Sequence, residues 1–205
     1  DGVIVKTHFV KHAVMLSLFA DHPGQQDAIS EFILSNGGVP RKAKLAHLLR
    51  TNLRTEPTEA LLSEYLRRYA AELEHRLAAA PMVEGVSEFI AACPATRYVC
   101  SSAPEAEVHD QVARRSLGPH LAAVYGSTTP KPHALRAIAA KHPGRPVVFF
   151  GDSVGDYEAA CQAAVAFVGV VCERDGFQGM PVVRVTDFAH RATVEQAMLR
   201  SVAQR

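Results

Sequence analysis

The chain has 205 residues and a mass of 22.2 kDa; 48% of its residues are hydrophobic, 21% are charged, and 22 Lys and Arg nearly balance 21 Asp and Glu. At about 150 residues per domain, this length predicts one large domain, or a core with a modest insertion, that needs no disulfide or structural metal to fold. The small net charge and the lack of a block of Lys and Arg argue against nucleic acid and membrane as partners. We expect a small-molecule ligand and a monomer or homodimer.

The four cysteines are Cys93, Cys100, Cys161 and Cys172, and none of them forms a CxxC pair. Because they lie mostly in apolar runs, we predict reduced core thiols in a cytoplasmic protein rather than a disulfide framework or a zinc site. The longest weakly interrupted apolar stretch, Ala159 to Cys172, is too short to span a bilayer.

In chain order, the first strand is expected around Asp1 to Val5, and an all-helical unit follows from about Val14 to Ala80. Helical spacing there places five side chains on one face: Leu62, Leu66, Tyr69, Leu73 and Leu77. The segment Asn36 to Pro40 contains two glycines and a proline, which predicts a turn that divides this unit.

From about Met82 onward, short β-branched or aromatic runs alternate with helical patterns. The expected strands are Arg97–Cys100, Ala123–Tyr125, Val147–Phe150, Val165–Val171 and Val182–Val185. One helix between them is marked by Val108, Val112 and Leu117, another by Leu135 and Ile138, and the last is predicted to begin at Thr193 with Gln196 in a capping box. The alternation predicts an α/β protein, with a Rossmann-like parallel sheet core at residues 1–13 and 81–205 and an inserted α-helical cap at residues 14–80.

Chemically active side chains lie at the ends of the predicted strands. They are Asp1, the Ser101-Ser102 pair, Lys131, Asp152 and Asp156. Ligands of open parallel sheets bind outside the carboxyl ends of the strands, so these residues are expected to converge. Asp152 and Asp156 could bind Mg²⁺, which takes one or two carboxylates and keeps several waters. A metal, a lysine and hydroxyl donors at one point suit phosphoryl transfer, in which catalysis is mainly positioning and charge stabilisation.

Four segments of the sequence resemble, in order, the signature motifs of the haloacid-dehalogenase-like hydrolases. They are Asp1-Gly2-Val3-Ile4-Val5, Ser101 after Tyr98-Val99-Cys100, Lys131 in Thr129-Pro130-Lys131-Pro132, and Gly151-Asp152-Ser153 with Asp156. The resemblance covers the whole chain, and the helical unit is similar to the small α-helical cap of the family's sugar-phosphatase and β-phosphoglucomutase branch.

The resemblance implies a Mg²⁺-dependent phosphatase that acts on a small phosphorylated metabolite, such as a sugar phosphate, through an aspartyl-phosphate. Asp1 would be the general acid and base, and its main-chain carbonyl would bind the metal together with Asp152 and Asp156. Ser101, with Ser102, would bind the phosphoryl group and Lys131 would neutralise it.

The family's first motif is Asp-x-Asp-Gly, and Asp1 resembles its second Asp. The resemblance therefore implies that the nucleophilic Asp lies two positions before Asp1, in a longer natural chain. A protein that binds phosphate esters without cleaving them is the alternative.

Arg41, in the segment Gly38-Val39-Pro40-Arg41-Lys42, resembles a cap residue that contacts the distal part of the substrate. It could equally be a basic residue at the start of a surface helix. Asp152 and Asp156 could likewise be helix N-terminal acids, Ser101 and Ser102 a helix cap, and Lys131 a solvated charge. A phosphomutase is disfavoured, because Lys11 stands where mutase-type relatives have a hinge histidine.

Overall fold

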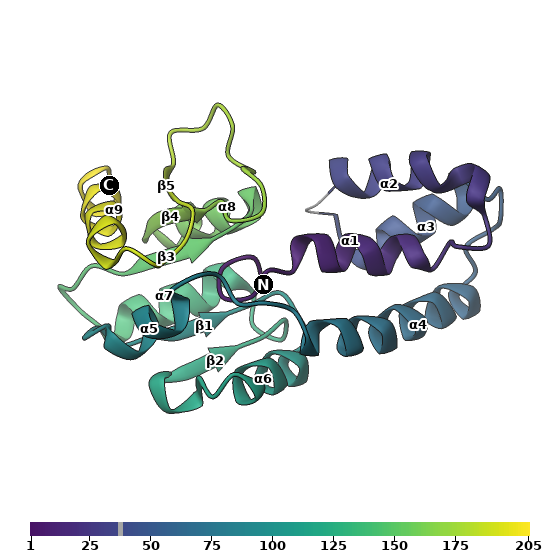
Figure 1. Cartoon of the computed structure of the whole chain (residues 1–205). Coiled ribbons are helices and arrows are strands. Elements are labelled where there is room, and N and C mark those ends of the chain that lie inside the picture. The colour runs from purple at the N-terminus through teal and green to yellow at the C-terminus, as the bar shows by residue number, and fades with distance from the viewer. Residues whose placement is uncertain (37–38) are drawn as a thin grey trace. The chain divides into compact units, whose positions relative to one another are not determined.

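The computed structural model describes residues 1–36 and 39–205. The chain divides into a core unit, made of Asp1–Lys6 and Pro81–Arg205, and a helical unit, Thr7–Ala80 (Figure 1). The first boundary was predicted after residue 13, and that position is wrong. The helix that begins at His8 continues to Ser17 and packs on other helices of the helical unit, so the whole of it belongs there.

Four helices and one short 3-10 helix make up the described part of the helical unit. They are α1 (His8–Ser17), η1 (Pro23–Gln25), α2 (Gln26–Ser35), α3 (Arg41–Thr51) and α4 (Glu59–Ala78). Helix α1 packs against α2 and α4, and α3 packs against α4. The predicted turn at Asn36 to Pro40 includes residues 37–38, which lie outside the described residues.

Helix α4 shows how the sequence determines this unit. Thr58 caps its first turn, because the Thr58 hydroxyl accepts a hydrogen bond from the Leu61 N–H. Leu62, Tyr69 and Leu73 are buried, as the helical spacing predicts.

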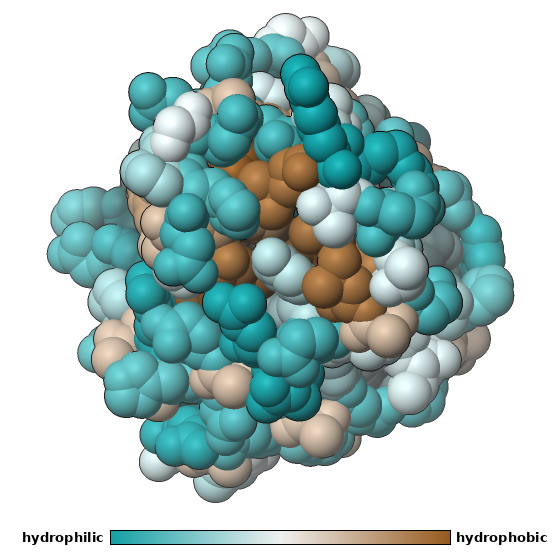
Figure 2. Space-filling model, turned by 90° about the vertical axis from the view of Figure 1, so that its right-hand side faces the viewer, coloured by the Kyte–Doolittle hydropathy of each residue, from teal (hydrophilic) through white to brown (hydrophobic). Residues whose placement is uncertain are grey.

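Figure 2 views the side on which Figure 1 draws the helical unit, and hydrophobic residues are visible in the middle of a largely hydrophilic face.

The core unit alternates strands and helices along the chain. Its helices are α5 (Val86–Ala92), α6 (Glu105–Arg114), η2 (Gly118–His120), α7 (Lys131–Lys141), α8 (Val154–Ala163) and α9 (Arg191–Ala203). Its strands are β1 (Tyr98–Cys100), β2 (Ala123–Tyr125), β3 (Val148–Gly151), β4 (Ala166–Val170) and β5 (Val183–Val185). The five predicted strands from Arg97 onward are therefore confirmed, with ends that shift by one residue at most.

All strand pairs in the described residues are parallel, as the prediction of an α/β core requires. β1 pairs with β2, and a second group has the order β3-β4-β5. Every residue of β4 is buried, whereas Tyr98–Cys100 of β1 and Val148–Phe150 of β3 are only half-buried. Within the described residues, β1 and β3 therefore each have one partner strand and an apolar edge.

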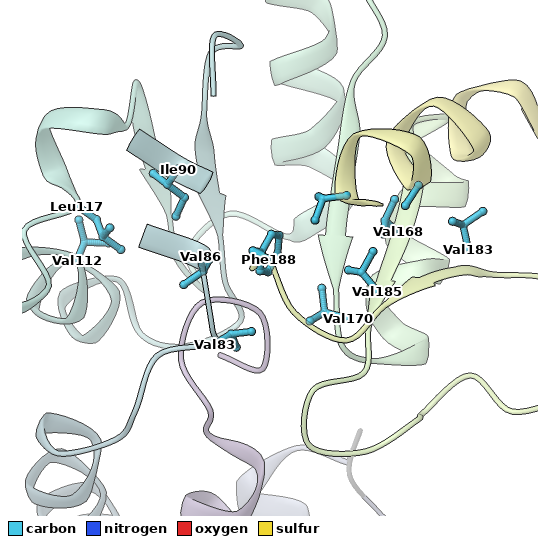
Figure 3. Packing of buried hydrophobic residues seen from close by; sticks show 12 residues of the cluster. Val83, Val86, Ile90, Val112, Leu117, Val168, Val170, Val183, Val185 and Phe188 are labelled. Atoms are coloured by element: carbon cyan, nitrogen blue, oxygen red, sulfur yellow. The ribbon is translucent and has the colours of Figure 1, made fainter. Parts of the chain in front are cut away.

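Helices cover both faces of the three-stranded group. Val168 and Val170 of β4 pack in a cluster with α5 and α9, which Figure 3 shows together with Val183 and Val185 of β5. Phe167, directly before Val168, points into a second cluster with α7 and α8. This alternation follows from the two-residue period of a strand and explains why β4 is apolar throughout.

Two predicted features of the core unit are wrong. Asp1 to Val5 does not form a strand: Gly2 has a φ of +63° and its N–H donates to the Val5 carbonyl, so the segment turns, and only Val5 forms an isolated antiparallel bridge, with Met82. Helix α9 begins at Arg191, two residues before the predicted start, and no side chain caps it.

No helix in residues 1–36 and 39–205 combines the length and the hydrophobicity that crossing a bilayer requires.

Candidate active site

Ser101 and Asp152 each follow the last residue of a parallel strand. Ser101 extends the pairing of β1, because its N–H donates to the Tyr125 carbonyl at 2.9 Å. The Ser101 hydroxyl oxygen accepts a hydrogen bond from the Ala103 N–H at 3.1 Å. That bond fixes the position of Oγ and leaves the hydroxyl proton for another acceptor. Asp152 directly follows β3 and is half-buried.

Helix α8 begins at this edge with a reciprocal capping box. The Ser153 hydroxyl accepts from the Asp156 N–H at 3.3 Å, and Asp156 Oδ2 accepts from the Ser153 N–H at 3.2 Å and from the Ser153 hydroxyl at 2.7 Å. Gly151 leaves room for this arrangement, because a Cβ there would lie 2.3 Å from the Asp156 Cβ. The local sequence therefore directs the Asp156 carboxylate back toward the end of β3.

Lys131 and Asp156 form an ion pair between the first turns of α7 and α8. Lys131 Nζ donates to Asp156 Oδ1, while Oδ2 is held by Ser153. The Asp156 side chain is 4% exposed and the Lys131 side chain 21% exposed, so the carboxylate is almost fully desolvated and the ammonium keeps some access to solvent. Because both oxygens of Asp156 are engaged, its clearest role is to anchor Lys131.

Asp152 lies against the amino-terminal turn. A Cβ on Gly2 would come within 2.1 Å of Asp152 Oδ2, so only a residue without a side chain fits here. The Gly2 carbonyl in turn accepts a hydrogen bond from Cys172 Sγ at 3.4 Å. Asp1 is exposed, and its main-chain carbonyl accepts from the Val3 N–H at 2.7 Å. The first residues of the chain and the end of β3 thus meet at one corner of the core unit.

Cys100, the last residue of β1, lies close enough to the Lys131–Asp156 ion pair for both charges to affect its pKa. Burial raises the pKa of Cys100 from an ordinary value of 9.0 to about 11; the positive charge of Lys131 opposes this rise in pKa and the negative charge of Asp156 adds to it. Cys100 directly precedes Ser101, so Ser101, Lys131 and Asp156 belong to the same region. The sequence prediction that separate strand ends converge agrees with this geometry.

The oxygen donors at the corner suit a hard cation. Within the described ranges, no three His, Cys, Asp or Glu side chains come together as a metal-binding group. Mg²⁺ does not require such a group, because it is typically held by one or two carboxylates and retains waters. The half-buried Asp152 carboxylate and the nearby Asp1 carbonyl fit that pattern, whereas zinc would require nitrogen or sulfur ligands.

No protein-family model and no curated protein sequence matches the chain. Solved structures do match it over nearly its whole length. A predicted phosphoglycolate phosphatase from Haemophilus somnus 129pt is 18% identical, covers 96% of this chain and 95% of its own, and has a TM-score of 0.76.

The HAD-hydrolase candidate YfnB from Bacillus subtilis, solved with bound magnesium, is 13% identical, covers 96% of this chain and 95% of its own, and has a TM-score of 0.67. The chain has the haloacid-dehalogenase-like fold. A candidate β-phosphoglucomutase from Thermotoga maritima shares this fold at 18% identity, with 96% of this chain and 95% of its own covered and a TM-score of 0.70.

The structure brings some of the predicted site residues together. Lys131 and Asp156 are in direct contact, and Asp152 lies against Gly2. Ser102 is exposed beside Ser101. The catalytic, substrate-binding and metal-binding roles assigned to these residues stay predictions.

Arg41 lies in the helical unit. It is the first residue of α3, and its guanidinium carbon lies 4.2 Å from the centroid of the Tyr69 ring. The ring is buried in the unit, so this cation–π contact gives Arg41 a structural role at the start of the helix. Its predicted contact with substrate stays a prediction.

Gly2 and Cys172 belong to this corner, and no sequence pattern predicts that they do. The missing side chain of Gly2 is what allows Asp152 to approach. Cys172 contacts Gly2 from 170 residues away, and no local pattern signals such a contact. Cys161 was predicted to be a core thiol, and that is wrong, because it is exposed on α8.

We expect Cys100 to resist alkylation near neutral pH, because its raised pKa keeps the thiol protonated. Iodoacetamide at pH 7.5, followed by mass spectrometry, should modify the exposed Cys161 well before Cys100. Since the folded state holds the Cys100 proton more tightly than the unfolded state, its contribution to stability is complete below about pH 9 and is lost as the pH rises toward about 11. Equal labelling of the two thiols in the folded protein would contradict this assignment.

Proposed function

We propose that the protein is a Mg²⁺-dependent phosphatase that hydrolyses a small phosphorylated metabolite, such as a sugar phosphate, through an aspartyl-phosphate. The proposal rests most directly on the buried Lys131–Asp156 pair, which lies at the strand ends beside Ser101. The haloacid-dehalogenase-like fold, shared with proteins named as phosphatases and hydrolases, adds support.

In this proposal the metal is held by Asp152 and by the main-chain carbonyl of Asp1, with Asp156 acting through Lys131. When bound, Mg²⁺ would neutralise negative charge on the phosphoryl oxygens. Gly2 contributes by leaving space for the Asp152 carboxylate.

The remaining residues bind and position the phosphoryl group. Ser101 would donate its hydroxyl proton to one phosphoryl oxygen, since the bond that its Oγ accepts from the Ala103 N–H fixes its position and leaves the proton for another acceptor. Lys131 offers a cation whose side chain is 21% exposed, enough to reach a ligand while Asp156 holds its position. A fixed positive charge stabilises the charge that spreads over the equatorial oxygens in the transition state.

In the mechanism that the resemblance implies, the nucleophile is the first Asp of the Asp-x-Asp-Gly motif, two positions before Asp1. Its carboxylate oxygen attacks phosphorus while the ester P–O bond breaks, and Asp1 protonates the departing alkoxide. Asp1, now a carboxylate, then takes a proton from the water that attacks the aspartyl-phosphate, which releases inorganic phosphate and restores the nucleophile.

The test uses the full natural protein with p-nitrophenyl phosphate and a panel of sugar phosphates and other small phosphate esters. We expect phosphate release that requires Mg²⁺ and stops when EDTA is added. Binding of phosphate esters without hydrolysis would favour a non-catalytic binding module. Absence of both binding and hydrolysis across the panel would refute the proposal.

A phosphomutase is the second candidate, because the Thermotoga maritima neighbour is named as a candidate β-phosphoglucomutase. A mutase keeps the phosphoryl group on the enzyme and returns it to another oxygen of the sugar. Incubation of a hexose monophosphate with a trace of hexose bisphosphate, followed by product analysis, distinguishes the two: a phosphatase releases free phosphate, and a mutase gives the isomeric monophosphate.

A further inference from the structure

The segment between β4 and β5 folds back over the Asp152 corner. Residues 171–182 leave β4, and the Val171 N–H still donates to the Val185 carbonyl at 2.9 Å, so both ends of the segment remain fixed to the sheet. Phe177 at its centre is fully buried and packs edge-to-face on Phe167, with ring centroids 5.6 Å apart. Its ring lies over Gly169, where a Cβ would come within 2.7 Å of it.

The same segment touches Asp152 and its neighbour Gly2. A Cβ on Gly176 would lie 3.2 Å from the Asp152 carbonyl oxygen, so the two backbones are close together. Four residues earlier, Cys172 Sγ donates to the Gly2 carbonyl. The carboxylate of Asp152 therefore lies against the amino-terminal turn, and its main-chain carbonyl lies against this segment.

Arg184 of β5 holds the tip of the segment. Its guanidinium Nη2 donates to the Phe177 carbonyl and to the Met180 carbonyl, the latter at 3.1 Å. Its Nε lies 3.4 Å from Asp175 Oδ1, and the same oxygen accepts the Phe177 N–H at 2.8 Å. A planar fork that joins two carbonyls and a carboxylate is specific to arginine, because the lysine ammonium lacks this geometry.

We infer that Arg184 is a positioning residue, which fixes the segment 172–180 against Asp152 and so holds Asp152 in the orientation that binds the divalent cation. The inference rests on the proposed function, since that function assigns the cation to Asp152. Arg184 acts on Asp152 only through the segment, to which its guanidinium is bound. Its partners differ from those of the Lys131–Asp156 pair.

The test compares Arg184→Met and Arg184→Lys with Arg67→Met, which removes an arginine of similar size from an exposed pair with Glu64 in the helical unit. The first readout is the MgCl₂ concentration that gives half of the full Mg²⁺-induced rise in the thermal midpoint. We expect this concentration to rise about tenfold in Arg184→Met, as is typical when a residue that orients a metal ligand is lost. Arg184→Lys should lie between Arg184→Met and the wild type, and Arg67→Met should match the wild type.

The second readout is hydrogen exchange at the Phe177 amide without metal, where Arg184→Met should exchange faster. If Arg184→Met does not fold, Asp175→Asn replaces it, because the amide oxygen still accepts the Phe177 N–H while the ion pair is lost. A lower thermal midpoint with an unchanged half-effective Mg²⁺ concentration would assign Arg184 a purely structural role and overturn the inference.

The outcomes separate this inference from the proposed function. Weaker Mg²⁺ binding in Arg184→Met, together with no phosphatase activity in the wild type, would support the inference and refute the function. Unchanged Mg²⁺ binding in Arg184→Met, together with phosphatase activity in the wild type, would refute the inference and support the function. A wild type whose thermal midpoint does not respond to Mg²⁺ would overturn both.

Discussion

Replacing Asp156 with alanine should lower the free energy of unfolding by about 3–5 kcal/mol, the range found when one partner of a buried ion pair is removed. The loss has two physical causes. The Lys131 ammonium would lose its partner in a position that is only 21% exposed, and the Ser153 N–H would lose the carboxylate that completes the capping box. Urea denaturation at pH 7, followed by circular dichroism, measures the change.

Asp110→Ala is the matched control for that prediction. It also removes a carboxylate from an ion pair, with Arg114, but both of those side chains are more than 40% exposed. Exposed pairs contribute about 0.2–1 kcal/mol, so the control should lose less than about 1 kcal/mol. Equal losses in the two variants would mean that the Lys131–Asp156 pair contributes no more than a surface pair.

Replacing Gly2 with alanine should weaken Mg²⁺ binding by about 10–100-fold, the range for residues that orient a metal ligand. A Cβ at this position would overlap the Asp152 carboxylate, which must then leave its present position. The half-effective Mg²⁺ concentration for activity, and for the rise in the thermal midpoint, should both increase.

Gly144→Ala controls for the backbone strain in that experiment. Gly144 has a φ of +73°, similar to the +63° of Gly2, but a Cβ there would meet nothing within 4 Å. The control should therefore show the cost of an alanine in a left-handed conformation, roughly 1–2 kcal/mol of stability, without a change in Mg²⁺ dependence. If both variants bind Mg²⁺ as the wild type does, Asp152 is not the metal ligand that we propose.

The parts of the fold that follow local patterns could be predicted from the sequence. Apolar runs such as that containing Ala166–Val170 are buried on both faces, and this property is visible in the sequence. The Asp1 to Val5 segment was wrongly assigned as a strand, because its β-branched residues favour one while Gly2 and the long-range bridge to Met82 impose a turn. Tertiary contacts decided the conformation there.

For the candidate site, too, the sequence predicts one part and not the other. The motif residues could be named because each follows a strand or begins a helix, but their partners could not. Nothing near Lys131 in the sequence indicates that its charge pairs with Asp156, and nothing near Arg184 indicates that it binds the Phe177 carbonyl. Such pairings depend on how helices and loops pack, which a local pattern does not specify.

The two connections between the core and helical units run side by side. Lys6 N–H donates to the Pro81 carbonyl at 2.9 Å, and Val83 N–H donates to the Ile4 carbonyl at the same distance, around the Val5–Met82 bridge. The chain therefore leaves and re-enters the core at one point. An exchange of residues 7–80 for another helical module would need only a single junction, so evolution or protein engineering could replace the helical unit while the core unit stays intact.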